Sequence, residues 1–361
     1  MPKRIEYIDV AKFLGMVLVI FTHAFKECHF VAFIFAFHLP LFFFLSGMTL
    51  KVDNVSFGDF LVKKLKRYIV PMFGLGLLGV LFEHLVKYIL NIDFNWDSVL
   101  IGVGRIINQT RTFAIWFLPS LFFSNLMVFG LHRLSRGNVF LTGLLTLPVL
   151  GVGIIFNLYH NISFVWNFDA ALFGLPFSYF GFLLRHPKME RVYAFLTGKR
   201  LVALGIGVAL LVVTYYISVY NYETYRVHLE MFRRVYRMHY VTLPCALLGC
   251  LGFVLFCRGI SNFVIARPVE MNLILLQFHQ VLAFPLFREI FFKDWWRSTA
   301  WLPVQDYRFV LMTLAMTAFS VAILSVLHLL IKYSPLSLIV NQPLPKFYYR
   351  KKADTSRVML S

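Results

Sequence analysis

Charged residues are scarce in this 361-residue chain, where Asp, Glu, Lys and Arg together make up only 14%. Soluble domains carry about 25% charged residues, whereas here hydrophobic residues reach 59% and the mean hydropathy is +0.73. A soluble globule cannot hide that much apolar surface from water. The sequence therefore excludes a soluble protein and predicts one in which lipid surrounds most of the chain.

Cysteine is also rare, and its four copies form no CxxC pair. Three of them, Cys245, Cys250 and Cys257, fall in or beside one apolar stretch, which argues against a disulfide framework or a thiolate metal site. The histidines inside the apolar stretches show no HxxxH or HxxE spacing either. We therefore expect no metal site and no permanently bound cofactor.

Long apolar runs fill most of the chain. A transmembrane helix needs about 20 mostly apolar residues, and ten segments meet this requirement, although Gln277, His279 and Pro285 interrupt the ninth. We predict an all-α polytopic membrane protein with about ten transmembrane helices. The predicted spans cover residues 8–26, 30–50, 69–90, 114–132, 139–157, 164–184, 201–220, 240–257, 270–288 and 309–331.

Acidic residues are few, with 17 against 35 Lys and Arg, which gives a net charge of +18. In a membrane protein, basic loops fix the topology and contact anionic lipid, so we expect membrane lipids rather than nucleic acid as partners. Placing both termini in the cytoplasm puts 22 basic residues inside and 11 outside. The sequence thus predicts a membrane domain over residues 1–335 and a basic cytoplasmic tail over 336–361.

One outer loop, residues 221–239, departs from this charge rule because it carries four arginines. Basic residues in an outer loop oppose the usual rule that basic loops stay in the cytoplasm, which suggests another role for them, such as binding an acidic ligand. A solvated amphipathic surface helix explains it equally simply.

A few ionisable side chains lie inside the predicted spans, where lipid makes them costly and therefore functional candidates. The first span carries Asp9, Lys12 and His23. Lys12 and His23 are eleven residues apart, which places them on one helix face, roughly 16 Å apart along the axis. Asp9 can pair with Lys12. Alternatively, Lys12 snorkels towards the interface and His23 only hydrogen-bonds within the bundle.

Further polar side chains recur at the depth of His23, in the outer halves of other spans: His38, Glu83, Asp169 and His279. Trp116 opens the fourth span at the outer interface. Together these residues predict one polar cavity that opens outward. An enzyme could use such a cavity, and so could a proton-coupled transporter or flippase of a small or lipid-linked substrate.

The same residues carry a family resemblance. The stretches that match are 8–15 followed by His23, 37–47, 63–71, 116–118 and 272–279. In this order they resemble the motifs of the acyltransferase-3 family of integral membrane proteins, and in particular the sugar and polysaccharide O-acetyltransferases similar to fucose O-acetylase. The family's usual Arg is Lys12 here, which keeps the charge but loses bidentate geometry.

The resemblance implies a membrane O-acyltransferase that moves an acyl group, typically acetyl, from a cytoplasmic coenzyme A thioester to a hydroxyl of an outward-facing carbohydrate. Acetyl-CoA or another acyl-CoA would be the donor substrate, and a carbohydrate or lipid-linked glycan the acceptor. The expected location is a cell membrane, namely the inner membrane of a bacterium. The protein could act as a monomer or as a homo-oligomer.

The resemblance also implies roles for single residues. His23 would act as a general base on the acceptor hydroxyl or as a covalent acyl carrier, with Asp169 or Glu83 to orient it. The expected donor-binding residues are Lys12, Asp9, Lys63, Lys64, Arg67 and Ser46. The expected acceptor-binding residues are His38, Trp116, His279 and Asn272.

Overall fold

The structure is a computed structural model that describes residues 5–90, 95–108, 113–159, 164–225, 239–261 and 271–340. All secondary structure in these ranges is helical, which confirms the predicted all-α class. The elements are α1 (Glu6–Ala24), α2 (His29–Met48), α3 (Phe57–Lys64), η1 (Leu65–Ile69), α4 (Val70–Ile89), α5 (Trp96–Asn108), η2 (Ala114–Trp116), α6 (Phe117–Leu134), α7 (Val139–Tyr159), η3 (Val165–Asn167), α8 (Phe168–Leu184), η4 (Pro187–Met189), α9 (Glu190–Gly198), α10 (Arg200–Tyr225), α11 (His239–Ile260), α12 (Asn272–Phe278), η6 (His279–Ala283), η7 (Leu286–Phe291), α13 (Lys293–Thr299), α14 (Tyr307–Lys332) and η8 (Pro335–Val340).

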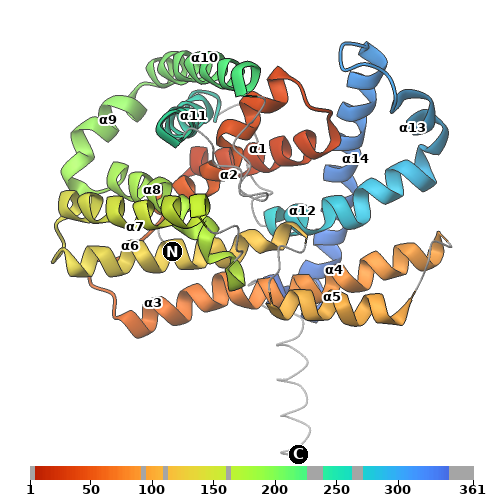
Figure 1. Cartoon of the computed structure of the whole chain (residues 1–361), viewed down its shortest axis with the longest axis horizontal. Coiled ribbons are helices and arrows are strands. Elements are labelled where there is room, and N and C mark those ends of the chain that lie inside the picture. The colour runs from red at the N-terminus through yellow and green to blue at the C-terminus, as the bar shows by residue number, and fades with distance from the viewer. Residues whose placement is uncertain are drawn as a thin grey trace, which may run out of the picture.

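Nine helical segments of the described chain are long and apolar enough to cross a membrane. A tenth, α8, is apolar but has only 17 residues, which is the lower limit for a bilayer span. These ten segments overlap the ten predicted spans, although the third, Phe57–Ile89, begins well before the predicted start at residue 69. Figure 1 shows them in one bundle, in which α1 and α2 lie between α6, α7 and α8 on one side and α12 and α14 on the other.

The ninth predicted span is an irregular helix. Its α-helical part, α12, ends at Phe278, and the wider π-helical turns η6 and η7 follow on either side of Pro285. Proline cannot donate a backbone hydrogen bond, and π turns are frequent where a helix accommodates a functional site. His279 is the first residue of the first π turn, so the irregularity begins at a predicted site residue.

Helices α2 and α8 cross with their backbones in direct contact. A Cβ atom on Gly47 would lie 1.9 Å from the Ser178 carbonyl oxygen, and one on Gly181 would lie 2.0 Å from the Phe44 carbonyl oxygen. Small residues allow this close approach, which is a main source of helix association in lipid. The crossing fixes the last turn of α2 and, with it, the position of Ser46.

The two ends of the bundle differ in character. One end, here called the basic face, holds the start of α1 and the ends of α2, α6 and α8; there Tyr7 of α1 hydrogen-bonds to Tyr193 of α9. The opposite end, here called the outer face, holds the end of α1 and the starts of α2 and α14. At the outer face Lys26 donates to the Leu302 carbonyl oxygen at 2.9 Å.

Two predicted segments lie largely outside the described residues. Helix α10 continues to Tyr225, and the four arginines of loop 221–239 fall beyond it, outside the described ranges. Of the predicted tail, residues 336–340 belong to η8, which packs against α4, with Val340 buried. Residues 341–361 are outside the described ranges.

Replacing Gly181 with alanine should destabilise the protein by about 1–3 kcal/mol, because the added Cβ would meet a backbone carbonyl that cannot move aside. Unfolding of the purified protein in detergent measures the effect. Gly151→Ala in α7 is the matched control, since a Cβ there meets open space. Equal stability of the two variants would contradict the close α2–α8 crossing.

Candidate active site

Two imidazoles from distant parts of the chain meet in the outer half of the bundle. His23 lies in the last turn of α1, and His279 opens η6. Nδ1 of His23 lies 2.8 Å from Nε2 of His279, and the rings are stacked with centroids 5.0 Å apart. His279 is fully buried at 0% exposure, whereas His23 is half-buried. His279 therefore supports His23 from the protein interior.

The hydrogen bonds select one tautomer for each neutral ring. Nδ1–H of His279 donates to the Leu275 carbonyl oxygen at 2.8 Å, so its Nε2 must accept. The proton between the rings therefore belongs to Nδ1 of His23, and the lone pair of His23 lies on Nε2. The side-chain amide of Gln280 lies 3.0 Å from the same Nδ1. The atom that faces it is the amide nitrogen, Nε2; with the proton of His23 on Nδ1, the amide must be turned so that its oxygen faces this nitrogen.

A cavity of about 340 Å³, here called the outer cavity, opens beside His23. His38 and Trp116 line it with His23, so the structure brings three predicted site residues to one space. The remaining lining is largely apolar, with four phenylalanines and a few polar groups. It comprises Val19, Thr22, Phe25, Glu27, Val31, Phe35, Leu39, Phe113, Ala114, Phe117, Leu276 and Gln280.

A second polar group, here called the inner cluster, lies nearer the basic face and consists of Ser46, Lys64, Tyr68 and Asn125. The Ser46 hydroxyl lies 3.0 Å from the Tyr68 hydroxyl and accepts from the Asn125 amide nitrogen at 3.0 Å. The Lys64 ammonium donates to the Asn125 amide oxygen at 2.8 Å and is only 6% exposed. An ammonium is thus held inside the bundle by a neutral amide.

Lys12, on α1, lies within electrostatic range of the inner cluster. It pairs with Asp9 at 3.9 Å, as the sequence predicts. Of the basic run 63–67, Lys64 alone is buried, while Lys63 and Arg67 stay exposed on the basic face. The predicted donor-binding residues therefore divide into two sets. Ser46 and Lys64 are buried, whereas Lys63 and Arg67 are exposed on the basic face.

Comparison with known families fits this arrangement. Residues 5–327 match the family model Acyl_transf_3, described as an acyltransferase domain. The chain belongs to the acyltransferase-3 family. It is therefore a membrane acyltransferase, and the histidine pair, the outer cavity and the inner cluster all lie within the matched range. No curated protein and no solved structure shows a significant match to it.

Besides His279, three of the predicted catalytic and acceptor-binding residues of this acyltransferase lie away from the outer-cavity lining. Glu83 pairs with Lys87, one turn further along α4, at 2.7 Å. Asp169 and Asn272 are at the starts of α8 and α12. The sequence suggests Asp169 or Glu83 as the group that orients His23, but the structure places His279 there.

His279 itself occupies a different place from the one predicted. The sequence assigns it to acceptor binding, whereas the structure buries it behind His23. Its ring nitrogens contact the Leu275 carbonyl and His23. In this acyltransferase it is therefore positioned to act on His23.

Sequence reasoning missed several groups of the site, and their signals differ. Asn125 is an amide inside an apolar span, and Gln280 directly follows the His of the last motif. Both could have been identified from the sequence as polar residues within apolar segments. Tyr68 resembles an ordinary interfacial tyrosine, and Glu27 and Phe113 lie outside helices without any pattern. Across the described ranges, no three His, Cys, Asp or Glu side chains stand close enough to hold a metal ion.

The predicted topology puts the mouth of the outer cavity outside the cell, and Cys28 can report on it. Cys28 follows the lining residue Glu27 and is half-buried, while the other three cysteines are buried. A membrane-impermeant maleimide should therefore label Cys28 in sealed right-side-out membranes.

The matched control places the only accessible thiol on the opposite end of the bundle. In a Cys28→Ser background, Gly58→Cys puts a thiol on α3, where a Cβ meets open space. This thiol should react only after the membranes are broken. The reverse labelling pattern would contradict the orientation.

Proposed function

We propose that this acyltransferase moves an acyl group, acetyl in the simplest case, from a coenzyme A thioester bound at the basic face to a hydroxyl of a carbohydrate bound in the outer cavity. The observation that carries the proposal is the histidine pair. Its hydrogen bonds leave a lone pair on Nε2 of His23, a residue that lines the cavity.

A sugar hydroxyl is a poor nucleophile unless a base removes its proton during attack. Nε2 of His23 takes that proton as the hydroxyl oxygen bonds to the thioester carbonyl carbon. When the C–S bond breaks, the imidazolium returns the proton to the coenzyme A thiolate. The step is balanced, because the acyl group and one proton exchange places between oxygen and sulfur.

His279 supports this proton transfer through its fixed tautomer. Its Nε2 accepts from Nδ1–H of His23, so it holds the ring in place and stabilises the imidazolium that forms. The Asp of a Ser-His-Asp triad does the same with a full negative charge. The neutral imidazole of His279 does so without a negative charge at Nδ1 of His23.

The lining of the outer cavity suits a carbohydrate. Phe35, Phe113 and Trp116 offer flat apolar faces, and Glu27, Thr22 and Gln280 offer polar atoms. Small-molecule sites typically combine an apolar wall with a few placed polar groups in this way. Trp116 is buried to 4% exposure, so the protein fixes its ring before a sugar arrives.

The inner cluster suits the donor. The ammonium of Lys64 and the charges of Lys12 and Arg67 can neutralise phosphate oxygens that approach from the basic face. Lys12 and His23 share one face of α1, roughly 16 Å apart along the helix axis. The proposal requires the pantetheine arm to extend along this face and deliver the thioester towards His23.

Replacing His23 by glutamine should lower the rate of acyl transfer by about 10²–10⁴-fold, because the general base is lost. The assay is release of free coenzyme A from acetyl-CoA by the purified protein supplied with glycan extracted from the same cells. His328→Gln in α14 is the matched control, since His328 is also a buried histidine but does not line the outer cavity. Wild-type rates for His23→Gln would refute the assignment, and thiol release by the wild type separates transfer from transport.

Replacing His279 by alanine should lower kcat by about 10²-fold and leave KM for the acceptor unchanged, because His279 positions His23 rather than binding substrate. His279→Gln should recover part of the rate, since its amide oxygen can accept from Nδ1–H of His23. The pH profile of kcat/KM should shift in the alanine variant, which a purely structural role would not cause. An unchanged profile would argue against the positioning role.

A further inference from the structure

A second cavity lies at the basic face, separate from the outer cavity and the inner cluster. Its volume is about 250 Å³, and it is formed by the segment that follows α2 and the segment that follows α8. The residues that line it are Leu50, Lys51, Val52, Asp53, Phe182, Arg185, His186 and Pro187. None of them has a part in the acyl transfer described above.

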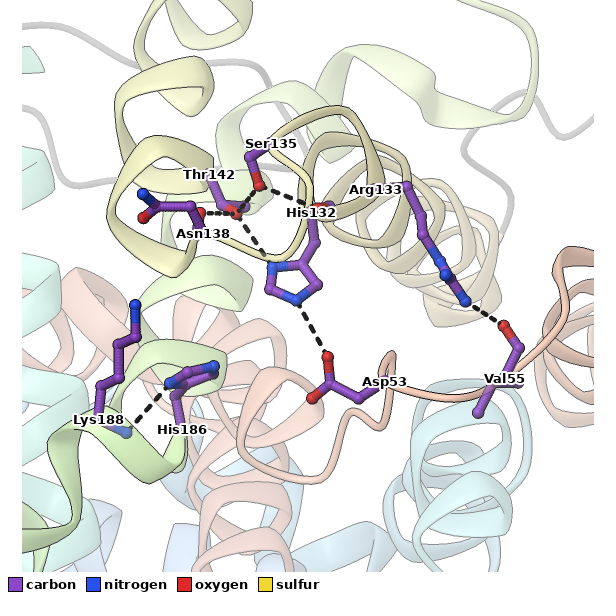
Figure 2. A network of polar contacts seen from close by, with 9 residues as sticks. All are labelled: Asp53, Val55, His132, Arg133, Ser135, Asn138, Thr142, His186 and Lys188. Atoms are coloured by element: carbon purple, nitrogen blue, oxygen red, sulfur yellow. Dashed lines mark hydrogen bonds and ion pairs between the residues drawn. The ribbon is translucent and has the colours of Figure 1, made fainter.

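One wall of this cavity is held in place by side chains from the end of α6 and the start of α7. Figure 2 shows His132 between Asp53 and Thr142. Nε2 of His132 lies 3.2 Å from the Asp53 carboxylate, and its Nδ1 lies 3.1 Å from the Thr142 hydroxyl. Arg133 also donates to the Val55 carbonyl oxygen. The segment after α2 is thus tied at two points, so the cavity is preformed.

The charge of the cavity is positive. Lys51 and Arg185 line it, and the one carboxylate in its lining, Asp53, is engaged by the buried His132. Arg185 lies over the ring of Tyr193, with the guanidinium carbon 4.5 Å from the centroid. This contact restrains the guanidinium beside the cavity instead of leaving it free in solvent.

His186 adds a neutral donor. Its Nδ1 accepts from the backbone N–H of Lys188 at 3.2 Å (Figure 2), so the proton of the neutral ring lies on Nε2. Burial lowers the pKa of His186; Asp53 acts against this, and His132 and Lys188 lower the pKa further. The ring is therefore neutral at pH 7 and can donate one hydrogen bond from Nε2.

The cavity also has an apolar floor. Val52 and Phe182 are 1% and 5% exposed, respectively, and Leu50 completes the surface. A ligand that fits both the positive wall and the apolar floor of this cavity carries an anionic group joined to a less polar part. Phosphate esters have this form, and Arg and Lys commonly bind their phosphate oxygens.

We propose that this cavity binds a phosphate ester, with Lys51 and Arg185 as counter-charges and His186 as a neutral donor. Two sources share this chemistry at a membrane surface. One is the headgroup of an anionic phospholipid, and the other is the phosphate of a soluble nucleotide.

Native mass spectrometry of the full-length protein in detergent tests the proposal, with phosphatidylglycerol and adenosine 3′,5′-bisphosphate as separate probes. At least one probe should bind with one-to-one stoichiometry. The double variant Lys51→Gln/Arg185→Gln should weaken that binding by at least about ten-fold. The probe that responds identifies the source.

The control is the double variant Arg191→Gln/Lys199→Gln, which removes the same charge from the basic face but does not alter the cavity lining. It should bind as the wild type does, and both variants should unfold at similar temperatures. If neither probe binds, or if both double variants weaken binding equally, the proposal is wrong. Because the experiment measures only binding, its result does not depend on whether the protein transfers an acyl group.

Discussion

Lipid offers no hydrogen-bond partners, so each polar side chain within these helices must find its partner inside the bundle. The inner cluster shows the consequence, because Lys64, Asn125 and Ser46 come from three different elements and satisfy one another. The histidine pair does the same for α1 and η6. The polar groups assigned to the proposed reaction therefore also fix how the helices meet. In this acyltransferase the proposed base, His23, is thus positioned by contacts within the bundle.

Much of the fold follows from the sequence, because apolar run length alone determines where a helix can cross lipid. The ten spans were predictable for this reason, including the interrupted ninth. The shared face of Lys12 and His23 was predictable from the helical period, and so was the Asp9–Lys12 pair. These features are all local to one helix.

The contacts between helices were not predictable in the same way. The helical period says which face a residue lies on, but not which helix packs against that face. Asp169 and Glu83 have the right depth and chemistry to orient His23, yet packing brings His279 there instead. Asn125 bonds to Ser46 and Lys64 only because α6 packs beside α2 and η1, and the close α2–α8 crossing depends on glycines in two distant segments. Tertiary packing, which a single sequence does not display, decided each of these.

Helix α1 links the two ends of the proposed reaction. It carries the cation near the basic face and the imidazole beside the outer cavity, so one rigid element sets the separation between donor entry and acceptor site. The histidine pair is the part of this account on which the chemistry depends, since it decides which nitrogen of His23 can take a proton.

Nitrogen NMR of the histidine-labelled protein tests this claim most directly, with His23→Gln used to assign the signal. The account predicts that His23 at neutral pH carries its proton on Nδ1 and a lone pair on Nε2. A His23 ring protonated on Nε2, with an unprotonated Nδ1, would contradict it.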